Sequence, residues 1–286
     1  MRRRRPGRSP HQALDALAVG IGTKKVKWVL DADIRDFFRD PRSRVAGRVH
    51  HFIQKWLSAG VPEDGRRTRS EVGTVQGGSV SPLLANVYLH YVFDLWIQRW
   101  RTTRARGDDE VVRFEHRAEA EALLAELRER FAKFGLTLHP DKTRLIEFGR
   151  YAEHNRRGRG DDKPPTFDFL GFTHICTKTK NGHFTVLRQT MRERFRAKLK
   201  EIKLELRRRM HDSTPELGRW LGSVVAGHVR YYGVPLNSKG IGAFRFAIGR
   251  LWKRSLERRS ERTRISWERM SRLIARWLPP ARVCHP

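Results

Sequence analysis

Cysteine is scarce in this chain of 286 residues, because Cys176 and Cys284 are the only two. No CxxC pair is present, so the sequence lacks the pattern of a zinc ribbon or zinc knuckle, and a disulfide framework is not expected. The twelve histidines do not follow the spacing of metal ligands either. This cysteine usage fits a reducing compartment and predicts a cytoplasmic protein.

Long apolar runs are also missing. No stretch approaches the ~20 continuous apolar residues that a membrane-spanning helix needs. The N-terminal MRRRRPGRS is basic but lacks the apolar core of a secretory signal. We therefore expect no membrane partner.

Acidic residues are few beside the basic ones. Lysine and arginine number 60 against 31 aspartate and glutamate residues, which gives a formal net charge of +29. So large an excess repels itself in the folded state, and a polyanionic partner would balance it. Nucleic acid is favoured over an anionic membrane, since the chain has no segment suited to lipid.

The first 190 residues mix strand and helix patterns. Val26–Leu30 reads as a buried strand that runs into Asp31 and Asp33, where carboxylates form either a site or a helix cap. Residues 151–165 read as a charged linker, and Asn181-Gly182 predicts a hairpin with a type I′ turn. The other expected elements are a helix after Ser9-Pro10, a buried helix over 83–96, a helix over 115–134, and strands over 136–138, 145–148 and 167–172.

From Met191 onward the pattern is purely helical. The first stripe contains Phe195, Leu199, Ile202 and Leu206, and basic residues cover the other faces. Three more helices are expected, one through a capping box at 213–216 to residue 232, one over 241–252 and one over 267–278. We therefore predict an α+β domain over 1–190 and an all-helical domain over 191–286.

The segment Arg106–Glu110, RGDDE, raises the question of a catalytic carboxylate pair. Two divalent metals about 4 Å apart need several anionic oxygens, which neighbouring aspartates could provide. Gly-Asp-Asp is equally common turn chemistry, because glycine and aspartate both tolerate bends. The three residues alone leave both readings open.

Five segments, taken in order, resemble one family. They are RPGRSPHQAL, VLDADIRDFF, GTVQGGSVSPLLANVYLHYVFD, GLTLHPDKTRLIEFG and FDFLGF. Together they resemble successive reverse-transcriptase blocks of bacterial group II intron proteins of the type without an endonuclease domain. The basic helical tail, with GHVRYY at 227–232, is similar to the thumb and maturase region of those proteins. The resemblance implies a reduced palm, with a small antiparallel sheet and packed helices, followed by a helical thumb.

The resemblance also implies roles for individual residues. Asp33 matches the aspartate that binds catalytic Mg²⁺, and Lys142 matches a basic residue near the triphosphate. Without the resemblance, Asp33 could be a cap and Lys142 a solvated side chain. The remaining positions assigned to nucleotide or template are Ile34, Phe38, Gln76, Gly77 and Gly78. We expect RNA contacts from Arg192, Arg194, Arg196, Lys198, Arg207, Arg208, Arg209, Tyr231 and Tyr232.

The chain departs from the family at the second metal motif. In the family, a segment like RGD-x-x-x-VR runs into a Y-A-D-D hairpin, whereas here Val111–Arg113 is followed at once by FEHRA. We therefore read Asp108 and Asp109 as a turn, since three intervening residues correspond to about 10 Å of strand. The chain also begins inside the usual fingers region, so we expect a shortened member.

Two functions follow from the resemblance and this departure. One is RNA-directed DNA synthesis on an RNA template with a DNA primer or target. The other is a maturase-like protein that binds group II intron RNA without a catalytic metal, because structured RNA is recognised by shape and backbone contacts. A decayed fragment of a mobile element is a third reading. Loss of metal-binding carboxylates should weaken polymerase chemistry before RNA binding.

Overall fold

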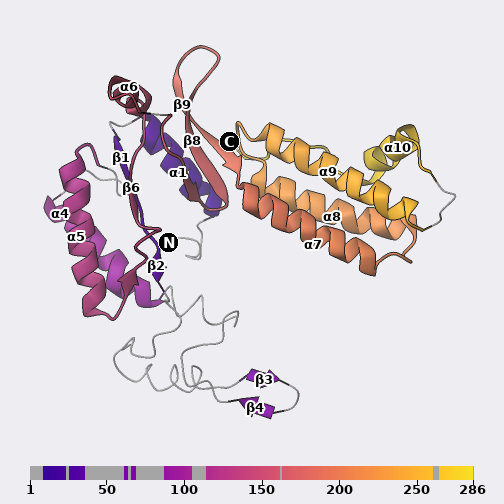
Figure 1. Ribbon diagram of the computed structural model, residues 1–286, viewed down its shortest axis with the longest axis horizontal. Coiled ribbons are helices and arrows are strands. Elements are labelled where there is room, and N and C mark those ends of the chain that lie inside the picture. Colours follow the sequence, from indigo (N-terminus) through magenta and orange to yellow (C-terminus); the bar gives the residue numbers. More distant parts are fainter. Residues whose placement is uncertain are drawn as a thin grey trace. The chain divides into compact units, whose positions relative to one another are not determined.

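The computed structural model describes residues 9–23, 26–35, 61–63, 66–68, 87–104, 114–161, 163–259 and 264–285. The chain divides into two compact units, Met1–Lys163 and Pro164–Pro286. Figure 1 shows that the first mixes short strands with helices, whereas the second joins a sheet to a group of helices. A mixed fold with small antiparallel sheets is therefore confirmed.

Helix α1 (Pro10–Thr23) opens the described part of the first unit. Ser9 Oγ accepts a hydrogen bond from the Gln12 N–H at 3.2 Å, and Gln12 Oε1 accepts one from the Ser9 N–H at 2.9 Å. These reciprocal bonds satisfy two backbone donors at the helix start. The cap that Ser9-Pro10 predicted is confirmed.

Two antiparallel strand pairs carry the aspartate segment. Strand β1 (Trp28–Asp31) pairs with β6 (Arg144–Glu147), and Asp31 lies opposite Arg144. Strand β2 (Ile34–Arg35) pairs with β5 (Thr137–Leu138). The turn over 139–143 consequently lies beside Ala32 and Asp33, which separate β1 from β2. A further strand pair is formed by β3 (Val61–Glu63) and β4 (Arg66–Thr68).

Three helical segments pack together in two apolar clusters of the first unit. The π-helical turn η1 (His90–Asp94) leads into α4 (Leu95–Arg104), and α5 is Arg117–Lys133. Buried residues of these clusters, from the helices and from the segments just before them, include Tyr88, Leu89, Val92, Ile97, Trp100, Phe114, Ala120, Leu123, Leu127 and Phe131. The segment over 83–96 was expected to be a buried helix, and its first four residues lie outside the described ranges. Over 87–96 the expected burial is wrong for one face, because Val87, Tyr91 and Leu95 are exposed.

The segment over 151–165 is not simply a linker. Residues Ala152–Gly158 form helix α6. Asn155 Nδ2 donates to Glu147 Oε1 at 3.0 Å, and Arg159 forms an ion pair with the same buried carboxylate. Glu147 therefore ties this helix to the end of β6, a contact that composition alone could not reveal.

The second unit begins with a three-stranded antiparallel sheet of β7 (Phe167–Phe169), β8 (Phe172–Lys178) and β9 (Phe184–Thr190). The segment FDFLGF, expected as one strand, is a hairpin. Leu170 and Gly171 form its two-residue turn with φ values of 52° and 83°, as a type I′ turn requires. Leu170 is buried, and its carbonyl accepts a hydrogen bond from the Tyr231 hydroxyl at 2.9 Å.

The hairpin between β8 and β9 is confirmed, but its expected turn type is wrong. Of the central Asn181-Gly182 pair, only Gly182 has a positive φ, at 79°. Its N–H donates to the Thr179 carbonyl at 2.9 Å. This is a type I turn followed by a left-handed glycine, the geometry of a slightly longer hairpin loop.

Four helices complete the second unit, and Met191 begins a stretch without strands among its described residues. They are α7 (Arg192–Arg208), α8 (Thr214–Tyr232), α9 (Ser238–Glu257) and α10 (Trp267–Trp277). Their shared core includes Ile202, Leu206, Leu217, Leu221, Val225, Phe244, Ile248, Trp252 and Met270. The expected capping box of α8 is present, because Glu216 Oε2 accepts the Ser213 N–H at 2.8 Å.

The sheet of β7–β9 belongs to the same compact unit as the helices. Asn237, between α8 and α9, accepts a hydrogen bond from the Thr190 N–H at 3.2 Å and donates to Thr190 Oγ1 at 2.9 Å. The boundary between the two compact units therefore lies before β7. The apolar residues take up a purely helical spacing only from Met191 onward. Whether function divides at Met191 stays a prediction. None of the helices in the described residues is both long and apolar enough to cross a membrane.

Candidate nucleic-acid interface

Asp33 and Lys142, far apart in the sequence, lie side by side in the first unit. The Asp33 carbonyl accepts a hydrogen bond from the His139 N–H at 2.8 Å, which fixes the turn that carries Lys142. Lys142 Nζ is then 3.6 Å from Asp33 Oδ2, and both side chains are more than half exposed. An exposed ammonium beside an exposed carboxylate can contact a phosphate while the carboxylate faces a cation.

The neighbouring carboxylate, Asp31, has a different partner. Arg144 Nη2 donates to Asp31 Oδ2 at 3.1 Å, across the β1–β6 ladder. Asp31 is therefore engaged in a cross-strand pair. Ile34 packs its side chain against the apolar cluster that includes Tyr88 and Leu138, so in this structure it supports the strand beneath Asp33.

One face of α7 carries five cations and no acid. Arg192, Arg196, Lys200, Lys203 and Arg207 recur at intervals of four, four, three and four residues, which places them on one side of a helix. All five are exposed, and none forms an ion pair with an acid in the part of the chain that the structure describes. We call these five residues the α7 basic face.

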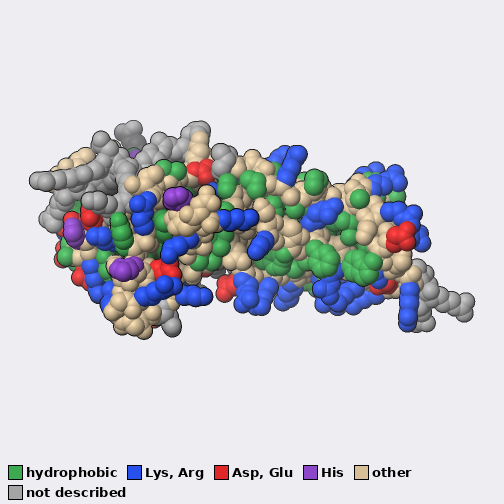
Figure 2. Space-filling model, turned by 90° about the horizontal axis from the view of Figure 1, so that it is seen from above, with side chains coloured by type: hydrophobic (Ala, Val, Ile, Leu, Met, Phe, Trp, Pro, Cys, Tyr) green, Lys and Arg blue, Asp and Glu red, His purple; other side chains and the backbone are tan. Residues whose placement is uncertain are grey.

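Lys200 and Lys203 were absent from the RNA contacts expected from sequence. The helical spacing itself carries the signal, because both fall on the same side as Arg196 and Arg207. Lys198 and Arg208, which were expected, lie on the opposite flank and pair with Glu201 at 2.7 Å and Glu205 at 3.7 Å. Figure 2 shows Lys and Arg side chains far outnumbering Asp and Glu over the helices in that view.

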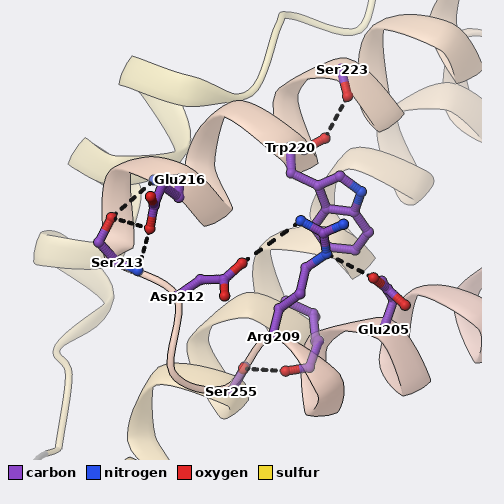
Figure 3. A network of polar contacts seen from close by, with 9 residues as sticks. Glu205, Arg209, Asp212, Ser213, Glu216, Trp220, Ser223 and Ser255 are labelled. Atoms are coloured by element: carbon purple, nitrogen blue, oxygen red, sulfur yellow. Dashed lines mark hydrogen bonds and ion pairs between the residues drawn. The ribbon is translucent and has the colours of Figure 1, made fainter.

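Arg209 is held in a polar network at the end of α7. Its guanidinium lies over the Trp220 ring, with its central carbon 4.9 Å from the ring centroid. Arg209 Nε donates to Glu205 Oε1 at 2.7 Å, and Nη1 is 3.7 Å from Asp212 Oδ2 (Figure 3). This arrangement joins α7 to α8, so packing accounts for Arg209 without RNA. Its expected RNA contact stays a prediction.

Tyr231 and Tyr232 also have packing partners. Both rings contact Phe172, at centroid distances of 6.1 and 5.2 Å, and Tyr231 donates its hydroxyl proton to the Leu170 carbonyl. Burial raises the pKa of Tyr232, and the nearby Arg194 guanidinium opposes that rise. The tyrosines therefore fasten the β7–β8 turn to α8, and their contact with RNA is untested.

Phe38, Gln76, Gly77, Gly78, Asp108 and Asp109 lie outside the described residues. The roles expected for these residues stay predictions. Residues 2–174 match the family model of reverse transcriptase (RNA-dependent DNA polymerase), which is more than half of the chain. The chain belongs to the reverse transcriptase family.

Intron proteins are among the individual relatives that the chain resembles. It is 34% identical over 96 residues to the group II intron-encoded protein LtrA of Lactococcus lactis, covering 30% of this chain and 16% of LtrA. It is 36% identical over 96 residues to a 91 kDa protein in the cob intron of Schizosaccharomyces pombe, covering 30% and 12%. Protein YkfC of Escherichia coli is 29% identical over 118 residues, covering 36% and 31%. The chain spans less than a third of the length of each.

Reverse transcriptases generally use divalent metal ions, and Asp33 has the chemistry of one ligand. Magnesium in phosphoryl-transfer sites takes one or two carboxylates together with substrate phosphates. Among the described residues, no group of three histidine, cysteine or acidic side chains could hold a metal ion. Asp31 faces Arg144 and Asp33 faces Lys142. The described residues alone therefore do not complete a metal site, and we derive no reaction step from one.

Proposed function

We propose that this chain is a group II intron protein that binds intron RNA in a maturase-like role, with weak or absent DNA synthesis. The α7 basic face is the observation that carries the proposal, because five exposed cations on one helix face suit a run of phosphates. The family match and the similarity to LtrA support an intron RNA as the partner. On this proposal the first unit is a reduced palm and the helices form a thumb.

RNA-directed DNA synthesis is the second candidate, and the Asp33–Lys142 pair favours it. In this reading Asp33 would be one Mg²⁺ ligand and Lys142 would contact the triphosphate of an incoming nucleotide. The RNA template and the DNA primer or target would then be further partners. The absent Y-A-D-D segment argues for impaired catalysis, since phosphoryl transfer depends on electrostatic groups fixed in place.

RNA binding should depend strongly on salt and on the α7 basic face. Replacing Arg192, Arg196 and Lys200 with glutamine should weaken binding to structured RNA and lower the slope of log K against log salt by about one per cation. Glutamine keeps helix propensity while removing charge. Lys180, Arg269 and Arg272, all exposed, provide a control triple with the same charge loss. Equal weakening in both triples would contradict a role for this face.

Templated synthesis should be little or absent when the purified protein is given Mg²⁺, an RNA template and a DNA primer. Changing both Asp108 and Asp109 to alanine should leave extension and RNA binding unchanged, because the sequence before Val111–Arg113 predicts a turn there and not a metal site. Primer extension by gel electrophoresis measures the first outcome. Extension by the unmodified protein that the double variant loses would identify RGDD as catalytic.

A further inference from the structure

The C-terminal halves of α7 and α9 form the walls of a groove. It has a volume of about 120 Å³ and is lined by Lys203, Leu206, Arg207, Met210, Leu251, Arg254, Ser255 and Arg258. Ser255 Oγ donates to the Leu206 carbonyl at 3.5 Å, which links the two walls (Figure 3).

Four of the eight lining residues are cations and none is acidic. Lys203 and Arg207 come from α7, Arg254 comes from the last turn of α9, and Arg258 is the C-cap residue of α9. None of them has an ion pair with an acid in the described ranges. The nearby acids serve other cations, because Glu205 pairs with Arg208 and Arg209, and Glu257 pairs with Lys253. The groove therefore keeps its positive charge.

Helix termini explain only part of this charge. Cations in the last turn of a helix stabilise the helix dipole by typically 0.3–1 kcal/mol. Arg207 and Arg254 lie in such last turns. Lys203 lies a turn earlier, where that effect has decayed, and the dipole gives no reason for two helices to face their cations into one groove. Like charges brought together favour binding of an anion.

We propose that this groove binds the phosphodiester backbone of structured RNA, with α7 and α9 contacting phosphates from its two walls. The proposal rests on the RNA-binding function proposed above and adds Arg254 and Arg258 as contacts. Guanidinium groups bind phosphate oxygens in a fork geometry. The apolar side chains in the lining, Leu206, Met210 and Leu251, offer no charged acceptor that would compete for the cations. Lys203 and Arg207 belong to both the groove and the α7 basic face, so the two surfaces are continuous.

The test changes Arg254 and Arg258 to glutamine in the full chain and uses Arg269→Gln with Arg272→Gln as the control. Both pairs remove two positive charges from exposed positions in or next to a helix of the same unit, but Arg269 and Arg272 do not line the groove. The probe is a labelled structured RNA, titrated between about 50 and 200 mM salt. We expect the groove variant to bind roughly tenfold more weakly and its salt slope to fall by about two. The control variant should keep most of its RNA affinity and most of its salt slope.

Thermal unfolding by circular dichroism is measured on the same proteins. If Arg254 and Arg258 only stabilise the helix dipole, the groove variant should melt at a lower temperature but match the control in RNA affinity and salt slope. This result would overturn the proposal that the groove binds RNA. Equal losses of affinity in the two variants would overturn it as well. Failure of the unmodified protein to bind structured RNA would instead refute the proposed function.

Discussion

Replacing Gly222 with alanine should destabilise the helical unit by about 1–3 kcal/mol, the usual cost of overpacking a filled core. A Cβ atom at this position of α8 would lie 2.6 Å from the carbonyl oxygen of Trp277, at the end of α10. The obstacle is backbone, so rotation of a side chain cannot relieve it. Gly218, one helical turn earlier, similarly faces the Trp277 ring, with its nearest ring atom 2.6 Å from an added Cβ.

Gly227 provides the matched control on the same helix. It is exposed, and an added Cβ would meet nothing within 4 Å. Alanine there should raise stability by roughly 0.5–1 kcal/mol, because glycine loses more conformational freedom when it enters a helix. Urea unfolding followed by circular dichroism measures both variants. Equal changes in the two would mean that α8 and α10 do not approach as closely as Gly222 implies.

The helices of the second unit could be predicted well from sequence. Their apolar stripes and caps are local signals, as Ser213 and Glu216 show. The capping box is set by residues three apart, so no distant contact is needed to form it. The apolar run at Val26–Leu30 is also a local signal, and the strand predicted there lies within two residues of β1.

Turn geometry could not be predicted where distant contacts decide it. Asn181-Gly182 favours a type I′ turn in isolation, yet that turn occurs at Leu170-Gly171. A leucine at positive φ is costly by itself. Here the burial of Leu170 and the hydrogen bond from the Tyr231 hydroxyl, sixty-one residues away, hold it in place. The sequence FDFLGF alone gives no sign that Tyr231 will bond to this turn.

The candidate site shows a similar limit. The resemblance gave roles to Asp33 and Lys142, and the structure places them 3.6 Å apart, but periodicity alone did not link them. The groove between α7 and α9 was beyond sequence reasoning, since Arg254 joins Arg207 only when the two helices pack together. A charge count finds the excess of cations but not the surface on which they converge.

The second unit should lose stability as the pH falls from about 6.5 to about 4. Burial lowers the pKa of His174 to about 4, and the positive charge of Arg188 adds to this effect. Burial likewise lowers the pKa of His228 to about 4, with a smaller contribution from Lys198. An unfolded chain restores a value near 6.5. Between these values the unfolded state binds more protons, so acid favours unfolding.

Replacing His228 with leucine should reduce this acid sensitivity. His228 stacks on Phe244 with ring centroids 3.5 Å apart, and its Nε2 has no hydrogen-bond partner in the described structure. Each histidine should contribute on the order of 3 kcal/mol between neutral pH and full protonation. Urea midpoints compared at pH 7 and pH 5 for the two proteins measure the difference. The variant should lose less stability on acidification than the unmodified chain, even if it is less stable at pH 7. An identical loss in both would show that His228 is not protonated on unfolding in this range.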